Sequence, residues 1–341
     1  MVSRVAAYIQ LLRRDGNLTL VRAPEKPFTA DVVVTPIQFG SGRGARTCAC
    51  RVEIHLDAWR GSRKLPGHRH ECRCGTQECV RHSFSRRGWY KSNMTISRDF
   101  DICMPDGAAD AVLFRPEGSG RWPGVMHLPD IGGIRQAHRD MAARLAGEGF
   151  VVLLPNVFYR TARSPLPRKQ GETPEEFAIR FAALTDRLTP EAIAGDTAAY
   201  VDTLAASEWV DPGAPLGVVG YCYTGAFAMR VAAARPDRIA AAASFHGGRL
   251  VTDTPGSPHL LLPRIQARLY FGHAVQDRSM PEEAIRKLEE ALAAWGGKFE
   301  SETYEGAYHS WTVPDSPVYH APQAERAYGK LRELMQTLVS A

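Results

Sequence analysis

Cys222, Asp277 and His309 are side chains of the types that catalyse acyl transfer. A cysteine thiolate attacks a carbonyl carbon, a histidine accepts the thiol proton and later returns one to the leaving group, and a carboxylate orients the histidine and steadies its charge. Cys222 lies in the segment 220–225, GYCYTG, where the apolar run 216–219 leads into a helical stretch of small residues. A strand, a sharp turn and a helix in this order are typical of a nucleophile elbow, which exposes the reactive side chain.

Predicted strands also precede the other two residues. Asp277 follows an apolar strand at residues 269–272, and His309 follows a strand at residues 298–304. The order nucleophile, acid, histidine, each on the loop after a separate strand, is that of the α/β-hydrolase fold. Because the carboxyl ends of parallel strands meet at one edge of a sheet, we expect the three side chains to lie together.

Other residues compete for these roles. His246 and His273 also stand at strand ends, and each is an alternative for the catalytic base. His127 lies inside a predicted strand and is expected to be a core residue. Asp315 is so close to His309 in sequence that we do not expect it to approach the histidine from a neighbouring strand. Free cysteines are often only small buried hydrophobes, which is the alternative for the nucleophile.

The loop at residues 129–133, PDIGG, follows the first predicted parallel strand and precedes a helix. In this fold the second oxyanion donor comes from that loop, and the first comes from the residue after the nucleophile. The backbone N–H groups of Ile131 and Tyr223 are therefore the predicted oxyanion hole. Asp130, in the same loop, is on motif grounds a helix cap or turn residue.

Short β-type runs and amphipathic helical runs alternate from residue 94 onward. This alternation predicts an α/β fold with a mostly parallel sheet and helices on both faces. The segments 96–103 and 109–114 are predicted to open the domain as a hairpin. Residues 156–188 are less regular and are interpreted as a short cap over the site.

Residues 1–93 differ from residues 94–341 in charge. The former carry 17 Lys and Arg against 7 Asp and Glu, and the latter carry 25 against 30. The first part also holds five of the seven cysteines, so the second has no disulfide framework. The Gly, Arg, Ser, Cys and His content of residues 1–93 predicts a poorly ordered basic extension, with a helix near residues 3–14 and an alternating stretch at residues 52–56. Alternatively, translation begins at Met94 and the extension is not part of the natural protein.

The extension contains histidines and cysteines at short spacings: His68, His70, Cys72, Cys74, Cys79 and His82. These residue types suit zinc, but their spacings match no familiar paired motif. We therefore predict no metal and no other cofactor, and no nucleic-acid partner despite the positive charge of the extension. No run of 18 apolar residues and no secretory signal occurs, so the sequence predicts a cytoplasmic protein without a membrane partner.

The motifs around the predicted catalytic residues resemble those of the dienelactone hydrolase family, the carboxymethylenebutenolidases. The resemblance rests on the segments 220–222, 276–277 and 306–310 and covers about residues 95–338. It implies a single-domain carboxylic ester hydrolase acting on a small-molecule ester or lactone, as a monomer or small homo-oligomer, without metal or organic cofactor. The alternatives are a general carboxylesterase or thioesterase of the same fold, and a non-catalytic relative with a zinc-binding N-terminal segment.

Two departures from the family pattern concern activation and substrate. The resemblance places Asp130 where family members usually have a glutamate that helps to ionise the cysteine, and an aspartate reaches one methylene less far. Family members also hold a substrate carboxylate with an arginine shortly after the catalytic histidine, and residues 310–313 contain none. Arg135, Arg160 and Arg180 are alternatives, although each is expected on the solvated surface. An unpaired carboxylate in an apolar pocket is costly, so we predict a different ester or lactone as substrate.

Overall fold

The computed structural model describes four strands in the first 56 residues, then residues 95–166 and 171–339. The strands form two antiparallel pairs: β1 (Gln10–Arg14) with β2 (Asn17–Val21), and β3 (Ala30–Pro36) with β4 (Cys50–Leu56). The predicted helix near residues 3–14 is therefore wrong over β1, whereas β4 contains the alternating stretch.

Several expectations for the extension lie outside the described residues. They are the candidate zinc ligands from His68 to His82, the poor order of the segments between the strands, and the boundary between residues 93 and 94. The chain divides into two compact units, Met1–Trp89 and Tyr90–Ala341. All side chains discussed below belong to the second unit.

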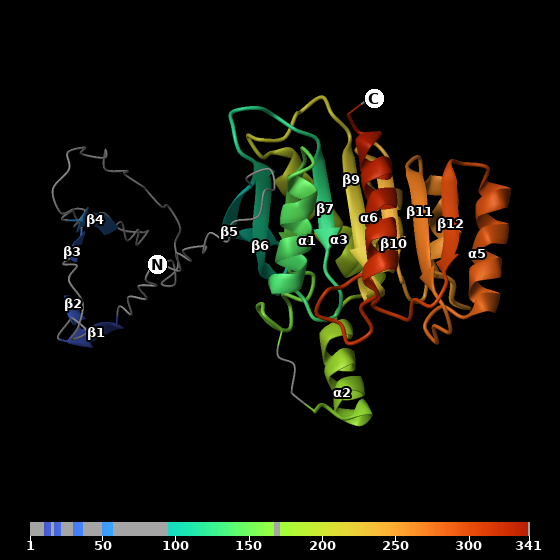
Figure 1. Ribbon diagram of the computed structural model, residues 1–341, viewed down its shortest axis with the longest axis horizontal. Helices are drawn as coiled ribbons and strands as arrows, with labels where there is room; N and C mark the ends of the chain where they lie inside the picture. The colour runs from blue at the N-terminus through green and yellow to red at the C-terminus, as the bar shows by residue number, and fades with distance from the viewer. Residues whose placement is uncertain are drawn as a thin grey trace. The chain divides into compact units, whose positions relative to one another are not determined.

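The second unit is built on one sheet (Figure 1). Its strands are β5 (Thr95–Met104), β6 (Gly107–Pro116), β7 (Gly124–Leu128), β8 (Val151–Pro155), β9 (Leu216–Tyr221), β10 (Ile239–Phe245), β11 (Arg268–Ala274) and β12 (Phe299–Tyr304). Their order across the sheet is β12-β11-β10-β9-β7-β8-β6-β5. Every pairing from β8 to β12 is parallel, and only the opening hairpin β5–β6 adds antiparallel pairings. The predicted mostly parallel sheet is confirmed.

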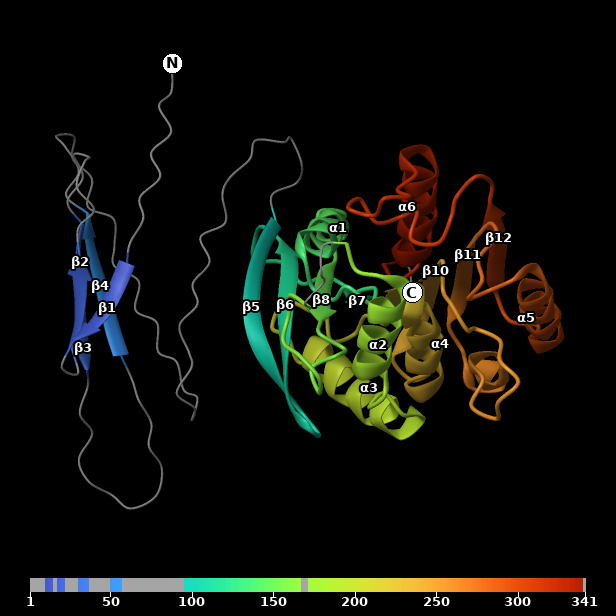
Figure 2. The ribbon, with the colours of Figure 1, turned by 90° about the horizontal axis from the view of Figure 1, so that it is seen from below.

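Helices cover both faces of this sheet (Figure 2). They are α1 (Gln136–Ala146), α3 (Pro190–Ala205), α4 (Gly225–Ala234), α5 (Glu282–Trp295) and α6 (Ala321–Gln336). α1 and α6 pack on one face, where Val125, Leu145 and Leu331 belong to one apolar core. α3, α4 and α5 pack on the other face in a second core. The central strands β7, β8 and β9 are buried along their whole length, as expected of parallel strands covered on both sides.

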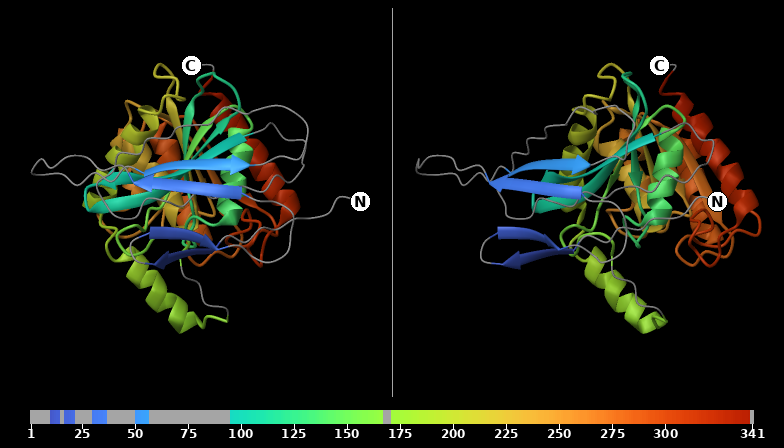
Figure 3. Two further views of the ribbon diagram at one scale, coloured as in Figure 1. Left: turned by 90° about the vertical axis from the view of Figure 1, so that its left-hand side faces the viewer. Right: turned by 60° about the vertical axis from the view of Figure 1, so that its left-hand side comes forward.

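One further helix, α2 (Pro174–Thr185), lies in the segment expected to be a cap. Its start is fixed by a capping box, in which Thr173 Oγ1 accepts a hydrogen bond from the backbone N–H of Glu176 and the Glu176 carboxylate accepts one from the backbone N–H of Thr173. α2 stands away from the sheet in both views of Figure 3. The ring of Phe181 on α2 is 5.4 Å from that of Tyr223, the residue after Cys222. This contact places α2 beside the predicted nucleophile.

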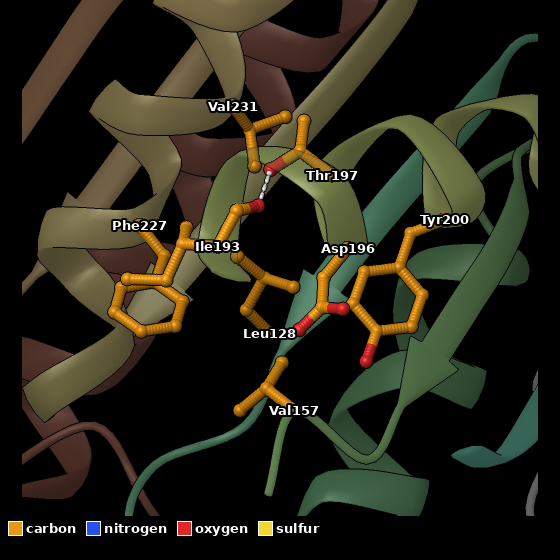
Figure 4. A pocket seen from close by; sticks show the side chains of 8 residues that line it. All are labelled: Leu128, Val157, Ile193, Asp196, Thr197, Tyr200, Phe227 and Val231. Carbon is orange, nitrogen blue, oxygen red and sulfur yellow. Dashed lines mark hydrogen bonds between the residues drawn. The ribbon is translucent and has the colours of Figure 1, made fainter. Parts of the chain in front are cut away.

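A small cavity lies between α3, α4 and the end of β7 (Figure 4). Its volume is about 10 Å³, roughly the space of one water molecule. The side chains that line it are mostly apolar: Leu128, Val157, Ile193, Asp196, Thr197, Tyr200, Phe227 and Val231. Asp196 is buried and ion-paired with Arg160 at 2.9 Å. We interpret the cavity as a packing gap in the core.

None of the helices among the described residues is both long enough and apolar enough to cross a membrane.

Candidate active site

Cys222 occupies the turn between β9 and α4, and its backbone is strained. Its φ of 56° lies in the left-handed region, which costs a residue with a side chain about 1–3 kcal/mol. The turn is tight because a Cβ atom on Gly220 would lie 2.1 Å from the carbonyl oxygen of Thr224. A Cβ on Gly225 would lie 2.5 Å from Gly247 Cα in the loop after β10. The two glycines therefore permit the sharp turn that the sequence predicts.

Thr224 lies in the elbow between Cys222 and Gly225, and its side chain explains why a threonine fits there. Its backbone φ is −80°, so no glycine is needed there. Thr224 Oγ1 accepts a hydrogen bond from the backbone N–H of Tyr221 at 3.0 Å and donates one to the carbonyl oxygen of Leu128 at 2.9 Å. The hydroxyl group is completely buried. Thr224 thus ties the elbow to the end of β7, where the predicted oxyanion loop begins.

The structure brings Cys222, His309 and Asp277 together. His309 Nε2 is 3.0 Å from Cys222 Sγ, and His309 Nδ1 is 2.6 Å from Asp277 Oδ2. Asp277 follows β11 and His309 follows β12, while Cys222 follows β9, so three strand ends meet at one edge of the sheet. The Asp277 side chain is 4% exposed and that of His309 is 31% exposed. The imidazole therefore joins a buried carboxylate to a sulfur atom that solvent can approach.

The ionised forms of His309 and Asp277 stabilise each other. Burial alone would lower the pKa of His309, but hydrogen bonds to Asp277 and Cys222 raise it to about 10. Burial would raise the pKa of Asp277, but hydrogen bonds from His309 and Ser279 outweigh it and lower the pKa. At neutral pH the imidazole is thus charged and the carboxylate ionised. A charged imidazole beside sulfur is the arrangement that favours a thiolate nucleophile.

Ser279 is a member of the site that the sequence analysis missed. Its backbone N–H and its hydroxyl group both donate to Asp277 Oδ1, at 2.8 and 2.7 Å. This leaves Asp277 Oδ2 to accept from His309. An aspartate followed two residues later by a serine is a local turn pattern, so Ser279 could have been found from sequence.

Ile131 and Tyr223 were predicted to supply the oxyanion hole. Ile131 lies in the loop after β7 and Tyr223 lies next to Cys222 in the elbow. Among the hydrogen bonds of the described residues, none has the backbone N–H of Ile131 or Tyr223 as its donor. Their role as the oxyanion hole stays a prediction. The adjoining strands β7 and β9 pair in the sheet, so the two loops begin side by side.

Asp130 is not hydrogen-bonded to Cys222. Its carboxylate accepts from both terminal nitrogens of Arg135, at 2.6 and 2.9 Å, and from the backbone N–H of Gly132 at 2.7 Å. Burial would raise the pKa of Asp130, but His138 and Arg135 together hold it well below its ordinary value. In this structure Asp130 shapes its own loop, and a role in ionising the cysteine stays a prediction.

The three arginines expected on the solvated surface are instead ion-paired. Arg135 bridges Asp130 and Asp315, which lies in the loop that carries His309. The side chain of Arg160 is 6% exposed, and Arg180 pairs with Glu172. The expectation of surface arginines is therefore wrong, because each guanidinium group is partly or fully covered where it pairs with a carboxylate.

None of the other histidines lies between Cys222 Sγ and Asp277 in the place of His309. His127 is buried, as expected, with Nε2 2.9 Å from His138 Nδ1. His273 is buried on β11, and burial lowers its pKa to about 4. His246 is also buried and contacts the backbone of Cys222. Within residues 95–166 and 171–339, no group of three or more His, Cys, Asp and Glu side chains is arranged to hold a metal ion.

A mostly parallel sheet covered by helices on both faces, with a strained turn after β9 and an acid and a histidine after later strands, defines an α/β-hydrolase fold. Residues 109–339 match the model of the dienelactone hydrolase family. The chain belongs to this family of hydrolases.

Individual relatives agree with this assignment. A carboxymethylenebutenolidase from Rhodococcus opacus is 30% identical over 210 residues, which are 60% of this chain and 78% of that protein. The structure resembles that of a dienelactone hydrolase-like promiscuous phosphotriesterase from metagenomic libraries, with a TM-score of 0.59, 22% identity and coverage of 72% of this chain and 98% of that one. A dienelactone hydrolase from Anabaena variabilis has a TM-score of 0.52 and 18% identity, with the same coverages. These structural likenesses concern the fold.

Proposed function

We propose that the protein hydrolyses a small-molecule ester or lactone through a covalent thioester on Cys222. The observation that carries the proposal is the chain of two contacts from Cys222 Sγ through the His309 ring to Asp277, at 3.0 and 2.6 Å. The strained backbone of Cys222 adds to it, because such strain is concentrated at functional sites. The names of relatives such as the Rhodococcus opacus carboxymethylenebutenolidase support ester chemistry.

The proposed reaction has two halves. In the first, Cys222 Sγ, whose proton His309 Nε2 already carries, attacks the carbonyl carbon, and the negative oxygen is held by the backbone N–H groups of Ile131 and Tyr223. His309 then gives its proton to the leaving alkoxide, and a thioester remains. In the second half, water attacks the thioester, His309 accepts its proton, and the thiolate of Cys222 leaves as the acid is released, which restores the starting state. Asp277 keeps the ring in one tautomer throughout.

Recognition of a negatively charged substrate would depend on a different arginine from the three suggested by the sequence. Arg135, Arg160 and Arg180 already pair with carboxylates. Arg249, in the loop after β10, is exposed and forms no ion pair with a described residue. Burial raises the pKa of Tyr223, the residue next to Cys222, and the positive charge of Arg249 opposes this rise. The charge of Arg249 is therefore felt beside Cys222. We infer that a substrate carboxylate would be held by Arg249.

Arg249→Gln tests this inference with two esters of equal size, one neutral and one bearing a carboxylate. We expect KM to rise about tenfold for the anionic ester, the effect of losing a charge-assisted hydrogen bond. KM for the neutral ester should stay unchanged. Equal changes for both esters would show that Arg249 does not recognise the substrate charge.

The proposed reaction is tested by hydrolysis of a panel of esters, thioesters and lactones by the full chain and by its Cys222→Ala variant. The matched control is Cys103→Ala, because Cys103 is the other free cysteine of the described residues and is exposed on β5. We expect the control to keep its activity and Cys222→Ala to lose at least about a thousandfold. If no member of the panel is hydrolysed by the unaltered chain, the non-catalytic alternative is favoured.

A further inference from the structure

His246 lies directly behind the elbow, in the loop after β10. Its Nδ1 accepts a hydrogen bond from the backbone N–H of Cys222 at 3.1 Å. Its Nε2 is 2.7 Å from Thr312 Oγ1, three residues after His309. The ring is 1% exposed, and its own φ is 40°. One buried side chain therefore contacts both loops that carry the reacting pair.

The hydrogen bonds fix the state of this ring. A backbone N–H can only donate, so Nδ1 of His246 must carry a free lone pair. A neutral imidazole has one proton, which then lies on Nε2 and is donated to Thr312 Oγ1. The charged form has no acceptor and would break the bond to Cys222. Burial and the nearby charge of His309 lower the pKa of His246 well below its ordinary value, which agrees with a permanently neutral ring.

The same loop also holds the other polar group of the Cys222 backbone. The N–H of Gly248 donates to the carbonyl oxygen of Cys222 at 3.2 Å. The loop can approach this closely because Gly247 packs against Gly225 at the start of α4. Residues 246–248 thus form hydrogen bonds with both polar groups of the Cys222 backbone, the N–H group and the carbonyl oxygen. A residue at φ of 56° keeps this strained conformation only where its surroundings hold it, and these two hydrogen bonds do so at Cys222.

We propose that His246 is a positioning residue of the active site, whose neutral ring ties the backbone of Cys222 to the His309 loop through Thr312 and thereby sets the distance between sulfur and the catalytic imidazole. This role rests on the proposed cysteine mechanism. It differs from that of a catalytic base, since both ring nitrogens of His246 are occupied by Cys222 and Thr312. The charged and titratable groups acting on the ring are His309, Asp130, Asp277 and His138.

Thr312→Val and Thr312→Ser separate the hydrogen bond from the space that the residue fills. Valine keeps the shape and removes the acceptor for His246 Nε2, while serine restores it. We expect kcat to fall about tenfold in Thr312→Val with KM unchanged, and to recover in Thr312→Ser. His246→Phe removes both hydrogen bonds, and kcat should fall about a hundredfold. All rates are expressed per reactive thiol, counted by alkylation of Cys222.

The matched control is His273→Phe. His273 is also a buried neutral histidine at a neighbouring strand end, but its Nε2 has no hydrogen-bond partner among the described residues. This variant should keep kcat within about threefold, since no hydrogen bond is lost. Melting temperatures of all variants show which of them fold. If His246→Phe does not fold, the two Thr312 variants decide alone.

The outcomes separate the inference from the function on which it rests. A fall in kcat per thiol in Thr312→Val, restored in Thr312→Ser, supports the positioning role. A lower melting temperature with kcat per thiol unchanged in Thr312→Val would overturn it, because the contact would then serve stability alone. Full activity of Cys222→Ala would instead refute the cysteine mechanism, whatever the Thr312 variants show.

Discussion

Thr224→Val should destabilise the domain by an amount that follows from its contacts. Valine has nearly the same shape as threonine but lacks the hydroxyl group, so the N–H of Tyr221 and the carbonyl of Leu128 each lose a buried partner. Leaving a buried polar group unsatisfied costs about 1–3 kcal/mol. The two groups together predict a loss of roughly 2–6 kcal/mol in the free energy of unfolding. For a domain of this size that is a fall of roughly 4–24 °C in melting temperature.

Thermal unfolding followed by circular dichroism measures this loss, with Thr224→Ser as the matched control. Serine keeps the hydroxyl group and loses only a methyl group, which should cost about 1 kcal/mol. Thr224→Val should therefore unfold at a clearly lower temperature than Thr224→Ser. Equal melting temperatures for the two variants would refute the view that this hydroxyl ties the elbow to β7.

Two further predictions concern charges around the site. The pKa of His309 is raised to about 10 in the folded chain, so its contribution to stability is fully present below its unfolded pKa of about 6.5 and is lost as pH rises through 10. Urea unfolding of the unaltered chain and of His309→Gln should show this loss as a shrinking difference in the free energy of unfolding. A difference that stays constant with pH would contradict the prediction. Arg135→Gln leaves the buried Asp130 carboxylate without its guanidinium partner and should destabilise the chain by up to about 3 kcal/mol. Arg135→Lys should restore little of this, since a lysine cannot pair with both carboxylate oxygens, and full recovery would argue against the bidentate contact.

The elements that carry the site were predictable because their signals are local. The hairpin segments 96–103 and 109–114 lie within β5 and β6, and the strand predicted at residues 298–304 differs from β12 by one residue. Gly220 and Gly225 marked the elbow because only a residue without a side chain permits such a close approach. Asp277 and His309 followed from their places after strands, since parallel strands bring such loops to one edge.

The network behind these residues was not predictable, since its partners are far apart in the chain. Arg135 and Asp315 are 180 positions apart, and no local pattern links them. His246 and Thr312 meet only because β10 and the loop after β12 end near the same edge of the sheet. The hydroxyl group of Thr224 meets the carbonyl oxygen of Leu128, which is 96 positions away on another strand, and no local pattern predicts this contact.

The central claim is that Cys222 Sγ forms the bond to the acyl group. Mass spectrometry after acid quenching of a reaction with a slowly hydrolysed ester tests this most directly. We expect the mass of the acyl group on the peptide that contains Cys222, in the unaltered chain and in Cys103→Ala, and no adduct in an inactive Cys222→Ala variant. Undiminished hydrolysis by Cys222→Ala, with no acyl group found on the Cys222 peptide of the unaltered chain, would contradict the claim.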